Sequence, residues 1–119
     1  MIGAFSRSIM LTAWTFALLV PRLEGHAILL SAAPASNEIV NGAAVHIRLQ
    51  FSSRIDVKRS RLILFLPSGT EQVLTAEEAS PGTLKSDVAQ LAPGRYLLRW
   101  QVLAEDGHIT RGELPFRTQ

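Results

Sequence analysis

Apolar and polar residues alternate with a period of two over much of the chain after residue 25. In residues 44–51, every second side chain is apolar and those between are mostly polar. This pattern is typical of a β-strand that has one face in the core and the other in solvent. The apolar positions of this predicted strand are Val45, Ile47, Leu49 and Phe51.

The same alternation predicts further strands over residues 62–66, 96–102 and 109–116. Shorter candidates cover residues 27–31, 72–75 and 83–91. Two Pro- and Gly-containing segments between them, Pro67-Ser68-Gly69 and Ala92-Pro93-Gly94, are turn signals. Residues 75–80 favour a helical turn instead, because Thr75 and Glu78 have the spacing of a capping box.

About seven short strands separated by turns predict an all-β fold. We expect a small antiparallel Greek-key β-sandwich or barrel of the immunoglobulin-like type. No segment has a long repeat of 3.6 residues, and no linker or internal repeat divides the chain. Residues 26–119 are therefore predicted to form a single domain, which is consistent with a total length of 119 residues.

The first 25 residues differ from this pattern and predict a secretory signal peptide. Arg7 precedes residues 9–20, which contain no charge, and Pro21 follows them. Twelve residues are too few for a membrane span of about 20 residues, but they suit the apolar region of a signal peptide. An N-terminal membrane anchor or a buried helix is the alternative interpretation. With a signal peptide we expect a periplasmic protein.

The position of signal cleavage remains open from the local sequence. Cleavage after Gly25 would make His26 the first mature residue, although Leu23 is a poor residue three positions from the mature start. Cleavage after Ala27 would satisfy the preference for two small residues better, and it would remove His26.

Composition excludes several kinds of chemistry. The chain has no cysteine, which excludes disulfides, thiolate zinc sites and cysteine nucleophiles. Twelve basic and ten acidic residues show no basic run, so we expect no nucleic-acid partner. Both methionines, Met1 and Met10, lie within the predicted signal peptide.

Histidine residues suggest metal chemistry. In an extended segment Asp106 and His108 would point to the same face and present an oxygen beside an imidazole nitrogen. The alternative is that Asp106-Gly107 is simply a hairpin turn that His108 follows. A mature N-terminal His26 would add its free amine and its ring. Three nitrogens and one oxygen suit tetragonal Cu(II), although Ni(II) or Zn(II) could also bind.

Other residues are assigned to the surface or the core. We expect His46 to be a solvated surface residue, and Tyr96 and Trp100 to belong to the core. Four basic residues are expected to form a solvated face rather than a phosphate site: Arg54, Lys58, Arg59 and Arg61.

Three parts of the chain are similar, in order, to the CopC-type copper resistance proteins. Residues 26–36 (HAILLSAAPAS) resemble the mature start of that family, and residues 45–53 (VHIRLQFSS) resemble its strand ending in Phe-Ser. The third part resembles the family's Gly-x-Tyr, Trp, Asp-Gly-His and Gly-x-x-x-Phe signature, and consists of residues 94–96, Trp100, residues 106–108, Gly112 and Phe116. Together they cover essentially all of residues 26–119.

This resemblance implies a periplasmic β-sandwich that binds one Cu(II) ion per chain through His26, Asp106 and His108. It implies a role in copper resistance, homeostasis or delivery to an inner-membrane protein of the CopD type, and cleavage just before His26. We expect a monomer. Some family members have a glutamate near the copper site where this chain has Ser53, so a fourth protein side chain is not assigned. Without methionine in the mature chain, we expect Cu(II) binding and no Cu(I) site.

Two other functions compete with copper carriage. A copper monooxygenase that cuts polysaccharides also uses an N-terminal histidine, but this chain is too short for a broad substrate surface, so we expect no enzyme. A metal-free, secreted β-sandwich that binds a partner through a sheet edge becomes the preferred interpretation if the mature chain starts at Ile28.

Overall fold

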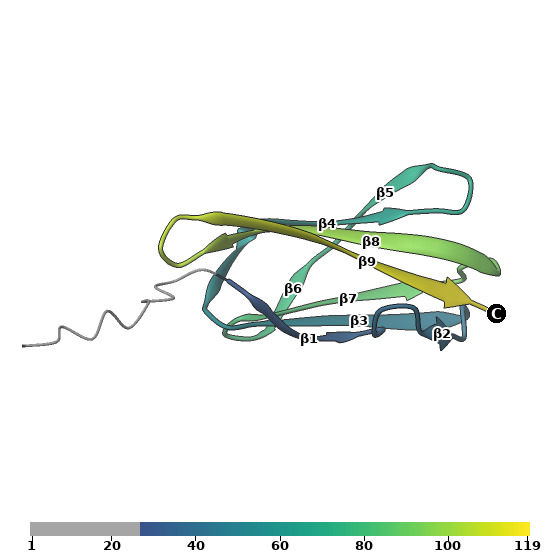
Figure 1. Ribbon diagram of the computed structural model, residues 1–119, viewed down its shortest axis with the longest axis horizontal. Helices are drawn as coiled ribbons and strands as arrows, with labels where there is room; N and C mark the ends of the chain where they lie inside the picture. The colour runs from purple at the N-terminus through teal and green to yellow at the C-terminus, as the bar shows by residue number, and fades with distance from the viewer. Residues whose placement is uncertain (1–26) are drawn as a thin grey trace, which may run out of the picture.

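Two β-sheets stacked face to face make up the part of the chain that the computed structural model describes, residues 27–119 (Figure 1). One sheet has four strands in the order β1-β3-β7-β6, and the other has five in the order β2-β9-β8-β4-β5. The strands, in chain order, are β1 (Leu29–Ala33), β2 (Ile39–Val40), β3 (Ala44–Phe51), β4 (Ile55–Phe65), β5 (Glu71–Leu74), β6 (Glu77–Ser80), β7 (Thr83–Ala89), β8 (Gly94–Ala104) and β9 (Ile109–Thr118).

The pairing of these strands confirms the predicted all-β sandwich. All neighbouring strands are antiparallel except β2 and β9, which pair in parallel over two residues. The described residues include no helix that is long and apolar enough to cross a membrane.

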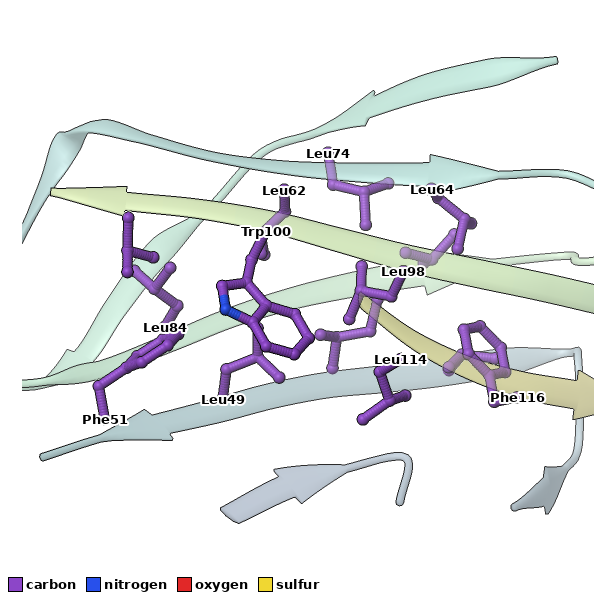
Figure 2. Close-up of a cluster of buried hydrophobic side chains, with 14 of the residues drawn as sticks. Leu49, Phe51, Leu62, Leu64, Leu74, Leu84, Leu98, Trp100, Leu114 and Phe116 are labelled. Atoms are coloured by element: carbon purple, nitrogen blue, oxygen red, sulfur yellow. The ribbon is translucent and has the colours of Figure 1, made fainter. Parts of the chain in front are cut away.

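The alternating pattern places the core between the sheets. In β3 the buried positions are the four apolar residues predicted for it, and the positions between them are exposed. Figure 2 shows Leu49, Phe51 and Leu84 on the four-stranded sheet facing Leu98 and Trp100 on the five-stranded sheet. Apolar burial of this kind is the main force that holds two sheets together, which matters in a domain without disulfides.

Tyr96 and Trp100 belong to this core as predicted, with 3% and 6% of their surfaces exposed. The Tyr96 hydroxyl donates a hydrogen bond of 2.7 Å to the carbonyl oxygen of Ala92, and the ring stacks on Phe116 at 5.5 Å. The Trp100 indole lies directly against Gly112 on the neighbouring strand, where a Cβ atom would overlap its ring. Glycine is therefore required at this position by close approach of an aromatic ring.

The prediction of a helical turn over residues 75–80 is wrong. Residues Glu77–Ser80 form strand β6, which pairs with β7 through Glu77–Lys85 and Glu78–Leu84. The backbone hydrogen bonds offered by the free edge of β7 outweigh the local capping signal. Gly82, at φ +80°, forms the turn between the two strands.

Other boundaries also differ from those predicted. Strand β4 begins at Ile55, seven residues before the predicted apolar run, and contains an irregularity in register between Asp56 and Arg61. Strand β2, with two residues, was not predicted. The sandwich therefore has nine strands within residues 27–119, two more than the seven expected, and the added ones are short edge strands.

Candidate metal centre

Asp106 and His108 lie in the turn that joins β8 to β9. A hydrogen bond of 2.9 Å from the Gly107 amide to the carbonyl oxygen of Ala104 closes this turn. Gly107 has φ +87°, in the left-handed region that glycine adopts without strain. The sequence argument that placed the pair in an extended segment is therefore wrong, and the hairpin turn that was its alternative is the observed structure.

The turn nevertheless brings the two side chains together. Oδ2 of Asp106 lies 2.8 Å from Nδ1 of His108, and Oδ1 accepts a hydrogen bond of 3.0 Å from the His108 amide. The side chain of His108 is 65% exposed, whereas that of Asp106 is 21% exposed. The carboxylate thus fixes both the backbone and the ring of His108, while the imidazole faces solvent.

This arrangement can bind a metal ion. A carboxylate oxygen and an imidazole nitrogen are both ligands of divalent transition metals, so Oδ2 and Nδ1 can bind one ion once the hydrogen bond between them is broken. Alternatively, Asp106 can accept the Nδ1 proton and leave Nε2 of His108 for the metal, a common role of a carboxylate beside a ligand histidine. Only the second arrangement keeps the observed hydrogen bond.

Two donors are too few for a stable site. Within residues 27–119 there is no group of three or more histidine, cysteine, aspartate or glutamate side chains that could hold a metal ion. His26, the third predicted ligand, lies outside the described residues. A complete site on this turn therefore requires at least one donor from elsewhere.

The described chain begins at the same end of the sandwich as this turn. Ala27 is completely buried, and Ile28 exchanges two hydrogen bonds with Ser52: its amide donates to Oγ at 2.9 Å, and its carbonyl oxygen accepts from the Ser52 amide at 2.8 Å. Two residues further along, the carbonyl oxygen of Arg54 accepts a hydrogen bond of 3.0 Å from the Glu105 amide.

Hydrogen bonds thus connect residue 28 to residue 52 and residue 54 to residue 105. Residues 27–28, 52–54 and 105–108 together are called the turn end. The sequence argument did not identify Ser52 as a positioning residue. Its only signal was its place after Phe51 at the end of a predicted strand. Ser53 lies in the same loop.

His46 is a surface residue, as predicted, and it lies away from the turn end. It lies on the outer face of β3, 78% exposed, with Nδ1 2.7 Å from Oδ1 of Asp87 on β7. Five residues of strand, about 16 Å, separate it from Phe51. The chain therefore contains a second histidine–aspartate pair, which sits on an open sheet surface.

Comparison with known proteins identifies the family. A model of the CopC domain matches residues 29–119. The chain belongs to the CopC family. Protein YobA of Escherichia coli K12 is 29% identical over 106 residues, which cover 86% of each chain.

Two solved structures resemble this CopC-family chain. CopC from Methylosinus trichosporium OB3b is 26% identical with a TM-score of 0.71, and the match covers 79% of this chain and 94% of the other. PcoC from Escherichia coli, described as a methionine-rich copper resistance protein, is 25% identical with a TM-score of 0.63, covering 79% and 99%. The fibronectin(III)-like modules of Clostridium thermocellum CbhA, 13% identical with a TM-score of 0.51, share the fold alone.

This CopC-family chain differs in its sulfur-containing residues from PcoC, which is described as methionine-rich. Residues 27–119 contain neither methionine nor cysteine. The described part of the chain therefore offers nitrogen and oxygen donors only, which favour Cu(II) over Cu(I).

Proposed function

We propose that this protein is a periplasmic Cu(II)-binding protein that acts in copper resistance, homeostasis or delivery. One ion per chain is held by the amine and ring of His26, the carboxylate of Asp106 and the imidazole of His108. The predicted signal peptide, residues 1–25, is removed to expose that amine. The protein acts as a monomeric carrier or buffer, without enzymatic activity, and a CopD-type membrane protein is its proposed partner.

The contact between Asp106 and His108 carries this proposal. It places a carboxylate 2.8 Å from an imidazole nitrogen, and the turn end also holds Ala27, the residue directly after His26. Consecutive Cα atoms are only 3.8 Å apart, so the anchoring of residues 27–28 restricts where a preceding residue can reach. The nitrogen and oxygen donors support Cu(II), and membership of the CopC family supports copper as the metal.

The first test is the mass of the mature protein from the periplasm. A chain that starts at His26 supports the proposed ligand set. A chain that starts at Ile28 has lost His26 and contradicts it, and the metal-free interaction module would then be the better interpretation.

The second test is a Cu(II) titration of the mature protein, followed by electron spin resonance. We expect one equivalent to bind with a tetragonal spectrum containing nitrogen couplings. His26→Ala and His108→Ala should each abolish this signal, whereas His46→Ala, a matched change in the exposed pair on β3, should preserve it. Equal spectra for all three variants would refute the site. A separate assay tests the carrier function: if the copper-loaded protein oxidised a polysaccharide with peroxide, the protein would be an enzyme and the carrier function would be refuted.

A further inference from the structure

A cluster of charged side chains lies on the outer face of the five-stranded sheet, away from the core. Arg61 of β4, Gln101 of β8 and Arg111 of β9 are directly opposite one another in consecutive strands. The next row contains Ile63, Arg99 and Glu113. These six residues line a shallow groove of about 550 Å³, which we call the arginine groove.

The arginine groove is more positive than the protein as a whole. It contains three guanidinium groups and one carboxylate, whereas the chain after residue 25 has ten basic and nine acidic residues. Arg99 is already neutralised, because its Nε and Nη2 atoms donate to Oε1 of Glu113 at 3.0 and 2.7 Å, and its guanidinium lies 4.5 Å above the Phe65 ring.

The other two arginines retain donors for a ligand. Among residues 27–119, no ion pair involves Arg61 or Arg111, and both are exposed. Nε of Arg111 donates to Oε1 of Gln101 at 2.9 Å, which orients the guanidinium and leaves its terminal nitrogens available. Two strand spacings, about 9.6 Å, separate the backbones of Arg61 and Arg111.

The groove also has an apolar side. Ile63 is opposite Val73 of β5, whose surface is 72% exposed. A ligand that places a carboxylate on the arginines and an apolar group on Ile63 and Val73 would match both features. In an extended peptide, alternate side chains repeat about every 6.6 Å along one face, so residues two positions apart in one segment can supply such groups.

We propose that the arginine groove docks an extended acidic segment of a protein partner. Carboxylates of the segment pair with Arg61 and Arg111, and Arg–carboxylate pairs of this kind are directional and often bidentate. Arg111 lies only three residues, about 10 Å of strand, after His108, so a docked partner would be close to the turn end. Docking itself requires no metal, so it is independent of the proposed copper site.

An anionic membrane is the weaker candidate for this surface. Each basic residue near such a membrane strengthens binding about fivefold, so a net charge of two gives roughly 25-fold, which is little for a surface without a lipid-inserting segment. The row Arg61–Gln101–Arg111 instead provides donors at fixed strand spacing, which suits side-chain recognition.

The test uses the metal-free mature protein and the peptide Glu-Ser-Glu-Ser-Val-Ser, whose two glutamates and valine share one face when the peptide is extended. The control peptide is Lys-Ser-Lys-Ser-Val-Ser. We expect saturable binding of the acidic peptide with a dissociation constant below about 1 mM, and amide shifts in nuclear magnetic resonance spectra confined to β4, β5, β8 and β9. Vesicles containing phosphatidylglycerol are titrated in parallel.

Variants distinguish the groove from general charge attraction. Arg61→Gln combined with Arg111→Gln should weaken binding at least tenfold, whereas Arg48→Gln, an exposed position on β3 of the opposite sheet, should have little effect. Equal weakening by Arg48→Gln, shifts spread over both sheets, or binding to vesicles but not to the peptide would each overturn the proposal. Failure of copper binding would leave this result unchanged, because no copper is present.

Discussion

The most informative single substitution is Ser52→Ala at the turn end. It removes the Oγ atom that accepts the Ile28 amide at 2.9 Å, but it keeps the backbone bond of 2.8 Å from residue 52 to the Ile28 carbonyl. One such hydrogen bond contributes about 0.5–1.5 kcal/mol to stability. The midpoint of thermal unfolding should therefore fall by roughly 4–8 °C, the shift expected for about 1 kcal/mol in a domain of this size.

If His26 is a ligand, the free energy of copper binding should become less favourable by a similar amount. The anchoring of residue 28 is weakened in the variant, because only the backbone bond to residue 52 remains, so copper binding must itself restore part of the order of the first residues. A cost of about 1 kcal/mol corresponds to roughly fivefold weaker binding. Affinity is measured by competition with a chelator, and hydrogen exchange at the Ile28 amide reports the anchoring directly.

Ser31→Ala is the matched control for this experiment. Ser31 is also on β1, and its hydroxyl donates to Oε1 of Gln50 on β3 at 3.2 Å, between two exposed side chains. It should change neither exchange at Ile28 nor copper affinity. Faster exchange at Ile28 in Ser52→Ala with unchanged copper affinity would refute the argument that the start of β1 positions a copper ligand.

Three further predictions concern the packing of the core, the pH dependence of copper binding and the stability of the copper-bound protein. Gly112→Ala should destabilise the fold by about 3 kcal/mol in urea unfolding, because the new Cβ overlaps the buried Trp100 ring; a loss below about 1 kcal/mol would contradict this packing. Cu(II) affinity should fall as the pH drops below about 6, because protons compete for the ligand nitrogens; a flat profile in chelator competition between pH 5 and 7 would argue against imidazole ligands. Free Cu(II) at 100 times its dissociation constant should add about 2.7 kcal/mol of stability, and an unchanged unfolding temperature would contradict binding to the folded state.

The fold was largely predictable because a half-buried strand records its two faces in its sequence. The alternation in residues 44–51 predicted the observed burial of β3 residue by residue. Residues 75–80 were mispredicted because their strand depends on a partner, the edge of β7, which no local pattern contains. The two-residue strand β2 is likewise defined by its pairing with β9 and is too short to show a period.

The candidate site was predictable where its residues are close in sequence. Asp106 and His108 are two positions apart, so either an extended segment or a turn could bring them together, and the turn does so. The contribution of Ser52 depends on the register between β1 and β3 and on a bond across 24 residues. Spacing along the chain carries no information about such a contact.

The direction of β9 has a practical consequence for placing this molecule on a support. Its ten residues span roughly 30 Å, and they lead from the turn containing His108 to the carboxyl terminus at the opposite end of the sandwich (Figure 1). A linker or affinity tag fused after Gln119 would therefore keep the histidine-bearing loop facing outward, accessible to ions and to other molecules in solution.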